Sequence, residues 1–173
     1  DVIQFALERI CRYMGWQIGL AYAVTDFASG EMQIMPVYYL ADDSRLKFLL
    51  DASLATQLSA GESLPGAVWA TGAYVWSTDL ALEPLFTHQE AAEKASVKMS
   101  AAFPVLVGKV VTHVLQFYAT QAIEPDVDLL EAITHLGTQL GRIVERERSH
   151  DALRYSEARF RTIFQNAAIG IEL

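Results

Sequence analysis

The chain has 173 residues, of which 52% are hydrophobic and 20% charged, and its formal net charge is −8. This length suits one domain of ordinary size plus an appendage, and the acidic balance disfavours a nucleic acid partner. No apolar run reaches the roughly 18 residues that a spanning helix needs, and no signal-peptide pattern opens the chain, so we expect a cytoplasmic protein with no membrane segment in this stretch.

The chain opens with a predicted amphipathic helix over residues 1–14, which contains the single cysteine, Cys11. One cysteine excludes an intramolecular disulfide, a thiolate zinc cluster and a redox pair within the chain. Cys11 lies among apolar helix positions and is interpreted as a buried small hydrophobe. Those positions include Ile3, Leu7, Ile10 and Met14.

Two strands and a helix are predicted next. Residues 16–25 alternate with period two, residues 32–40 do so less strictly, and Ser29-Gly30 between them is typical of a turn, which together indicate an antiparallel hairpin. Residues 45–57 then place their leucines on one stripe, as an amphipathic helix does.

The stretch from Gly61 to Asp79 is dense in glycine and proline, the residues that begin and end helices and form turns. Leu64-Pro65-Gly66 predicts the start of a short helix that carries Trp69, Gly72 predicts its end, and residues 73–77 predict a short strand with Trp76. We interpret both tryptophans first as core residues, with stacking on a planar ligand as the alternative. Phe86 and Phe103 carry the same two readings.

A helix over residues 88–99 and two strands over 100–107 and 109–120 follow. The second strand is apolar on both faces, which indicates a central strand covered on each side. We therefore expect an α+β fold with a central antiparallel sheet of about six strands and helices on both faces. His113 within that strand is interpreted as a hydrogen-bonded core histidine, and Asp79 as a turn residue, with ligand contact as the alternative for each.

A long helix is predicted from Pro125-Asp126 onward. Its apolar residues form a heptad seam that either packs on the sheet or pairs with a second copy, and a homodimer is the favoured partner. The seam consists of Leu129, Ile133, Leu136, Leu140 and Ile143. Residues 145–151 are nearly all charged, and a second seam starts at Leu153 one residue out of phase, so the helix is expected to leave the domain there.

No catalytic or metal site is predicted. Ser149-His150-Asp151 contains the residue types of a nucleophilic triad. Consecutive helical residues point about 100° apart, however, so these three side chains cannot align as a relay. His88 and Glu93 lack the spacing of a chelating pair on a helix. We therefore expect no enzyme activity in this stretch.

Several motifs resemble the GAF domain of bacterial multi-domain sensor proteins. Leu64-Pro65-Gly66-Ala67-Val68-Trp69 and Trp76-Ser77-Thr78-Asp79 are similar to two GAF signatures, and Phe103-Pro104-Val105 with Val114 to Tyr118 resembles the family's closing strands. The similarity covers residues 1–148. Residues 149–173, through Ser156-Glu157-Ala158-Arg159-Phe160, resemble a helical linker and the truncated start of a PAS domain.

The resemblance implies a sensory and dimerisation module that signals through its C-terminal helix to PAS and output domains in the same chain. The parent protein is expected to be a histidine kinase, with a diguanylate cyclase or phosphodiesterase as the second candidate. For the module itself, the alternative to sensing is a ligand-free dimerisation scaffold. The candidate ligand pocket consists of Trp69, Trp76, Asp79, Phe86, Phe103 and His113.

Departures from the family's patterns bear on the ligand, whose identity stays open. His113 and Gln116 stand where the family often has glycine and glutamate. A covalent bilin is not expected, because Cys11 lies far upstream of the segments in which bilin-binding members place their cysteine. The signature of cyclic-nucleotide binders and the several cysteines of methionine sulfoxide reductases are not found.

Overall fold

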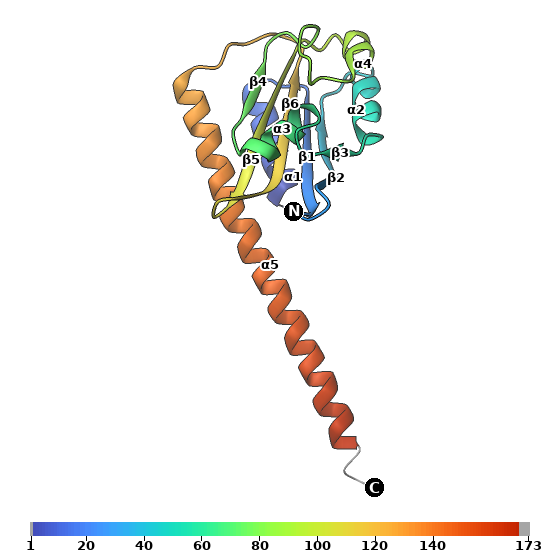
Figure 1. Cartoon of the computed structure of the whole chain (residues 1–173), viewed down its shortest axis with the longest axis vertical. Helices are drawn as coiled ribbons and strands as arrows, with labels where there is room; N and C mark the ends of the chain where they lie inside the picture. Colours follow the sequence, from blue (N-terminus) through green and yellow to red (C-terminus); the bar gives the residue numbers. More distant parts are fainter. Residues whose placement is uncertain (1, 170–173) are drawn as a thin grey trace.

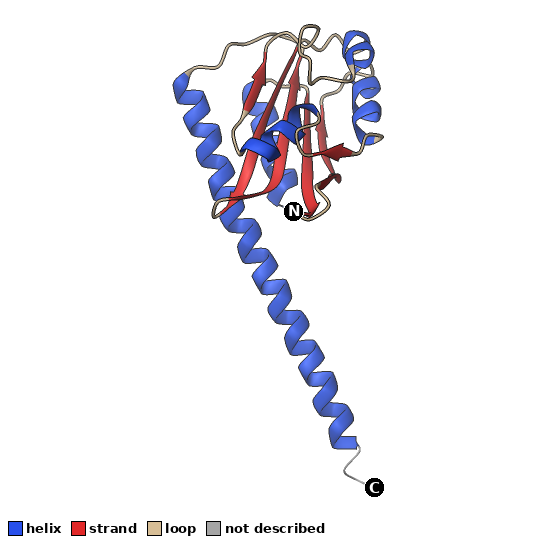
Figure 2. Cartoon of the chain, in the orientation of Figure 1, coloured by secondary structure: helices blue, strands red, loops and turns tan. Residues whose placement is uncertain are grey.

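An antiparallel sheet of six strands, in the order β3-β2-β1-β6-β5-β4, organises the chain (Figures 1 and 2). The computed structural model describes the backbone of residues 2–169 and the side chains of residues 2–159. The strands are β1 (Ile18–Asp26), β2 (Glu31–Leu40), β3 (Leu58–Ser59), β4 (Val75–Ser77), β5 (Met99–Val107) and β6 (Val110–Ala119). The helices are α1 (Val2–Met14), α2 (Leu46–Leu54), α3 (Ser63–Thr71), α4 (Gln89–Lys94) and α5 (Val127–Ile169). The predicted fold class and the long C-terminal helix are confirmed.

Strands β1 and β6 lie at the centre and pair antiparallel, with Ile18 opposite Tyr118 and Tyr22 opposite Val114. β6 is buried from Val111 to Ala119, as expected of a strand covered on each side. The predicted hairpin of β1 and β2 is present. β5 and β6 form a second hairpin whose turn places Gly108 at φ 62°, a left-handed conformation that glycine adopts without strain.

Two hydrophobic cores lie on opposite faces of this sheet. Side chains of α2, α3 and α4 pack on one face and form what we call the α2–α4 core, with Leu49, Leu64 and Val68 among its residues. Side chains of α1 and α5 pack on the other face and form the α1–α5 core, with Leu7, Phe117 and Ile133 among its residues. Residues of β1 and of β6 from Val114 to Ala119 therefore alternate between the two cores, whereas Val111, beyond the register shift between β5 and β6, lies in the α2–α4 core.

The helix predicted at Leu64-Pro65-Gly66 is α3, and it ends as expected. Gly72 adopts φ 68° and its N–H donates to the carbonyl of Val68 at 2.8 Å. Gly66, in the first turn of α3, is required because of a close contact. A Cβ on it would meet the carbonyl oxygen of Ser59, so only glycine lets this helix approach β3 so closely.

Helix α5 packs on β5 through two glycines. β4 pairs with β5 only as far as Ala102, so the rest of β5 forms the edge of the sheet. There a Cβ on Gly137 would meet the carbonyl oxygen of Pro104, and a Cβ on Gly141 would meet that of Leu106. Backbone contacts backbone at both points. After Val144 the helix leaves the sheet, and it continues unbroken through the charged stretch 145–151, which is exposed (Figure 1).

Two sequence predictions need correction. The helix expected over 88–99 is only α4, because Ser96 turns into the left-handed region (φ 56°) and Lys98 N–H bonds to the carbonyl of Ala119. The strand expected from Trp16 begins at Ile18. Trp16 N–H instead donates to the carbonyl of Cys11, and its side chain lies in the α1–α5 core.

Within residues 2–169, no helix combines the length and the apolar composition that crossing a membrane requires. The predicted PAS start lies mostly outside the described side chains.

We predict that Gly141→Ala destabilises the domain by roughly 1 to 3 kcal/mol, since the new Cβ would force α5 off the strand. In an ordinary helix interior the same change stabilises by about 1 kcal/mol. Urea denaturation measures the difference. Arg142→Ala, at the exposed neighbouring position, is the matched control and should stay within about 0.5 kcal/mol. A stabilised Gly141→Ala protein would show that α5 is not held at this contact.

Candidate functional site

A chain of polar side chains crosses the sheet beneath the α2–α4 core. Tyr22 on β1 donates its hydroxyl to Oε1 of Gln116 on β6 at 3.0 Å. Nε2 of Gln116 donates in turn to Oγ of Ser100 on β5 at 3.1 Å. All three residues are buried, and their strands are neighbours in the sheet. The network therefore spans three strands in a region that is otherwise apolar.

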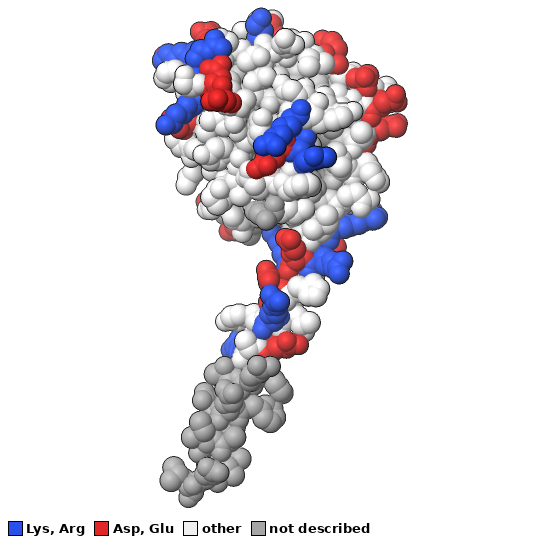
Figure 3. Space-filling view, turned by 180° about the vertical axis from the view of Figure 1, so that it is seen from behind, with Lys and Arg blue, Asp and Glu red and all other residues white. Residues whose placement is uncertain are grey.

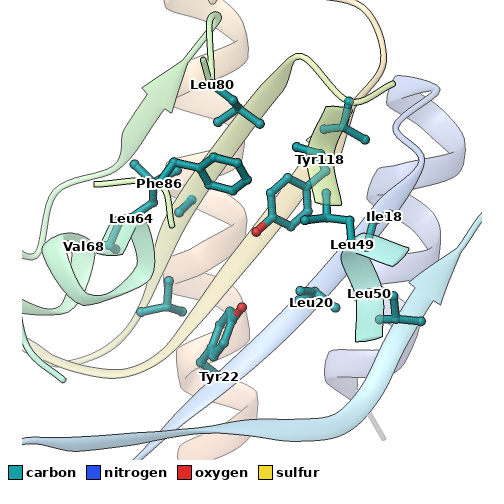
Figure 4. Close-up of a cluster of buried hydrophobic side chains, with 14 of the residues drawn as sticks. Ile18, Leu20, Tyr22, Leu49, Leu50, Leu64, Val68, Leu80, Phe86 and Tyr118 are labelled. Carbon is teal, nitrogen blue, oxygen red and sulfur yellow. The ribbon is translucent and has the colours of Figure 1, made fainter. Parts of the chain in front are cut away.

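A second tyrosine faces the first across this floor. Figure 4 shows the hydroxyls of Tyr22 and Tyr118 pointing toward one another from β1 and β6. Burial raises the pKa of both phenols. The neighbouring Tyr118 raises the pKa of Tyr22 further. The Ser53 side chain is a weak hydrogen-bonding neighbour of the Tyr118 phenol and lowers its pKa by a smaller amount, although Ser53 Oγ does not meet the distance and angle of a regular hydrogen bond. Both phenols are therefore neutral hydrogen-bonding groups at physiological pH.

The roof of the site comes from α2 and from the segment before α4. Ser53 is 2% exposed and its Oγ has no hydrogen-bond partner. Thr56 donates its hydroxyl to the carbonyl of Ala52 at 2.8 Å, and its Oγ1 lies 3.1 Å from Nε2 of His88. Since the Thr56 proton is already used, His88 carries its proton on Nε2 and donates it to Thr56. Burial lowers the pKa of His88, which keeps the ring neutral.

Between floor and roof lies a small cavity of about 20 Å³, whose outer lining residues, such as Thr87, are exposed. This is room for a water molecule and little more. No Asp, Glu, Lys or Arg is among the described side chains that line it, while seven of the lining residues carry side chains that can hydrogen-bond. These are Tyr22, Ser53, Thr56, Ser63, Thr87, His88 and Gln116. A small site results that has no charged lining residue and many hydrogen-bonding groups.

The six residues predicted as pocket wall do not come together. Phe86 lines the cavity, and Asp79 lies in the neighbouring surface cleft, where its carboxylate accepts from the N–H of Ala81 as the turn reading expects. Trp69 packs against the α2–α4 core without lining the cavity.

Trp76, Phe103 and His113 lie on the opposite face of the sheet. Trp76 and Phe103 form an edge-to-face pair at 6.1 Å in the α1–α5 core, and the indole N–H of Trp76 donates to the carbonyl of Ile123 at 2.8 Å. The reason is strand parity. Phe103 is an odd-numbered residue of β5, and odd positions of β5 face α5 while Ser100 and Ala102 face the cavity side.

His113 lies beneath the point where α5 leaves the sheet. It is 5% exposed, and its Nδ1 lies 3.1 Å from Oγ1 of Thr112, which itself bonds to the carbonyl of Val105. Burial and the positive charge of Arg148 on α5 lower the pKa of His113 to about 4. The reading of His113 as a hydrogen-bonded core histidine matches this geometry.

Sequence reasoning predicted Phe86 and noted Gln116 as a departure that bears on the ligand, but it missed Tyr22, Ser53 and Tyr118. Tyr22, Gln116 and Tyr118 stand at inward positions of strands that are otherwise apolar, and a polar group there is the signal that could have identified them. Ser53 gave no comparable signal, because a serine on an amphipathic helix is common. Cys11 is buried on the other face, where burial raises the pKa of its thiol to about 12.

The heptad seam of α5 divides between two environments. Ile133 and Leu140 are buried in the α1–α5 core, whereas Leu136 and Ile143 are both 43% exposed. The exposed pair lines a groove of about 670 Å³ between α1 and α5, together with Phe5 and Tyr13. Seen from behind, the domain shows a broad surface with few charged side chains, interrupted by one compact group of both signs (Figure 3).

Among the described residues, no three His, Cys, Asp or Glu side chains are grouped to hold a metal ion.

Comparison with known proteins identifies the class to which this architecture belongs. Residues 1–145 match the family model described as GAF domain. The chain belongs to the GAF family, whose members are regulatory and sensory modules. No match was found among curated proteins.

Solved structures agree on the fold. A GAF domain of a phosphoenolpyruvate-protein phosphotransferase from Coxiella burnetii superposes with a TM-score of 0.69 at 14% identity, covering 87% of this chain and 84% of that one. Free methionine-R-sulfoxide reductase from Neisseria meningitidis, in complex with its substrate, gives 0.67 at 17% identity, covering 86% and 78%. A NreA protein from Staphylococcus aureus, mutated in its nitrate binding site, gives 0.53 at 19% identity, covering 72% and 89%.

We predict that His113 makes stability depend on pH. Below pH 6.5 the histidine of the unfolded chain takes up a proton, but the folded protein does not until about pH 4, so the free energy of unfolding falls as the pH falls through this window. His113→Asn removes this component, which is measured as the difference between the denaturation curves of the two proteins at each pH. Arg148→Met should shrink the dependence by raising the pKa of His113. An unchanged dependence in His113→Asn would contradict the assignment.

Proposed function

We propose that this chain is the sensory and dimerisation module of a bacterial signal-transduction protein. It senses a small molecule in the cavity between the sheet and α2, and it transmits the signal through α5. The observation that carries the proposal is the buried Ser53 hydroxyl, which lacks a partner within a cavity lined by six further hydrogen-bonding side chains. A buried polar group without a partner costs about 1 to 3 kcal/mol, and an occupant that bonds to it recovers this energy.

The path from cavity to helix runs through β5. Ser100 on this strand belongs to the hydrogen-bonded floor of the cavity. Farther along the same strand, the carbonyls of Pro104 and Leu106 contact the glycines of α5. Because close-packed backbone cannot absorb a shift, a displacement of β5 by an occupant moves α5 as well.

The parent protein is proposed to be a sensor histidine kinase, with a diguanylate cyclase or phosphodiesterase as the second candidate. Residues 1–148 would form the sensory domain, and residues 149–173 the linker and the start of a PAS domain. Support comes from the family, from the sequence resemblance after residue 148, and from the length of α5, which leaves the sheet after Val144 and continues to residue 169.

Reductase chemistry is not proposed, although one similar structure is a methionine sulfoxide reductase. The chain has one cysteine, Cys11, which lies on the face of the sheet opposite the cavity. Its raised pKa makes the thiolate nucleophile scarce.

The alternative of a ligand-free scaffold is tested by filling the cavity. Ser53→Val removes the unpartnered hydroxyl and adds a methyl group where an occupant would lie. If the module senses, amide hydrogen exchange along residues 133–144 of α5 should change at least threefold. Lys47→Val, on the exposed face of the same helix α2, is the matched control and should leave exchange unchanged. Equal exchange in the two variants would favour the scaffold.

We further propose that a second copy of the chain covers the groove between α1 and α5. Phe5 and Tyr13 are 63% and 90% exposed there, beside Leu136 and Ile143. Large apolar side chains gathered on one face mark an interaction surface, and the heptad spacing of α5 suits pairing with its own twin.

We predict that Leu136→Glu combined with Ile143→Glu converts a dimer to a monomer without unfolding it, because both side chains are partly exposed and like charges would face one another. Native mass spectrometry measures the assembly and reports any retained small molecule at the same time. Arg142→Glu changes charge on the same helix outside the groove and should remain dimeric. A monomeric parent chain would refute the dimer.

A further inference from the structure

Most of the sheet's edges are protected within the described part of the chain. On β3 the Ser59 carbonyl accepts from the N–H of Glu62, and α3 packs against it. The free part of β2 contains Pro36 and is bent by a register shift against β1, two features that block the pairing of a further strand. On β5, α5 rests on the carbonyl of Pro104. β4 differs, because it pairs with β5 on one side and with no strand on the other.

The middle residue of β4, Trp76, points its backbone hydrogen-bonding groups away from the sheet. Pro104 on β5 has no N–H and its carbonyl contacts α5, so even-numbered residues of β5 direct these groups away from β6. Ser100 and Ala102 therefore bond to the two ends of β4. The N–H and C=O of Trp76 face outward, and no described residue bonds to either.

A groove of about 600 Å³ lies beside this strand, between Tyr74 and the first turns of α5. In Figure 1, β4 and α5 draw apart toward the start of the helix. Tyr74 is 43% exposed and stacks on Phe103 with ring centroids 6.0 Å apart, while Val127 on the opposite wall is 69% exposed. Exposed apolar side chains beside an unpaired strand suit a partner that adds as a further strand.

The charges around this groove are negative. Glu131 lines the groove, and no Lys or Arg does so among the described side chains. Glu124, Asp126 and Asp128, at the start of α5, are all exposed. A basic segment is therefore attracted, whereas a second copy of the chain at the same edge would bring two sets of carboxylates together.

We propose that the edge of β4 binds an extended, basic segment of a partner protein, which adds to the sheet between β4 and α5. Its backbone bonds to the N–H and C=O of Trp76, and its apolar side chains contact Tyr74 and Val127. Its Lys or Arg side chains reach Glu131 and the acidic residues at the start of α5. This inference goes beyond the sensory function, because it assigns to the domain a surface for a macromolecule.

The test uses a peptide of alternating lysine and valine, blocked at both ends and labelled with a dye. Fluorescence anisotropy measures its binding to the protein, and we expect a Kd below about 1 mM. At saturation, hydrogen exchange of the Trp76 amide should slow about tenfold or more, because that N–H gains a partner. The amide of Leu58, on β3 at the opposite edge, should be unaffected.

Matched controls separate strand addition from simple attraction of charge. The same peptide methylated at its backbone nitrogens keeps its charge but cannot donate to β4, so it should bind about tenfold more weakly or worse. Glu131→Lys should weaken the binding of the unmethylated peptide by about fivefold, since an attraction becomes a repulsion. Glu145→Lys makes the same change of charge at an exposed position about 21 Å farther along α5 and should stay within about twofold.

Absence of binding at about 1 mM peptide would overturn the proposal. Equal affinity for the methylated peptide would overturn strand addition, and equal affinity for a peptide of alternating glutamate and valine would overturn the basic partner. Protection of the Trp76 amide that rises with protein concentration in the absence of peptide would assign this edge to a second copy of the chain, against the proposal.

Discussion

Strand β6 has no face left for solvent, and the rest of the structure depends on this constraint. A strand buried on both faces must be covered by helices on each side, so the chain supplies α1 and α5 for one face and α2, α3 and α4 for the other. The side-chain period of two then assigns each residue to a layer. Phe117 packs under α1 and α5, while its neighbours Gln116 and Tyr118 point to the cavity side.

The two layers differ in chemistry although they share the sheet. The α1–α5 core is mostly apolar, with contacts among the aromatic rings of Trp16, Trp76, Phe103 and Phe117, and its one buried side-chain donor without a partner among the described residues is the indole N–H of Trp16. The opposite layer buries hydroxyls and an amide, one of them without a partner. Polar groups in such a place are costly unless they are satisfied, so their concentration on one face separates the layer suited to a ligand from the layer suited to transmission.

Close backbone contact makes this division useful for signalling. The Gly137 and Gly141 contacts bring α5 against the carbonyls of β5 with no side chain between them. Flexible side chains can absorb a small shift, but backbone on backbone cannot. The strand that closes the cavity floor through Ser100 is thus the strand on which the exit helix rests.

The family, the sheet and its helices could be predicted from the sequence. They follow from local motifs, from the spacing of hydrophobic residues and from the positions of glycine and proline. Gly72 ends α3 as predicted, since a left-handed helix end is a local requirement of the backbone. The α5 seam was recognised from spacing alone, but its division into buried Ile133 and Leu140 and exposed Leu136 and Ile143 depends on where the sheet lies.

The sequence by itself determined the class of fold and the residues available on each strand face. Only the tertiary structure decided that Trp69 and Trp76 lie on opposite sides of the sheet and that Ser53, Gln116 and Phe86 meet in one cavity. The physical reason is that these contacts join residues far apart in the chain. Their meeting is set by strand order and by the packing of helices, which no local pattern encodes.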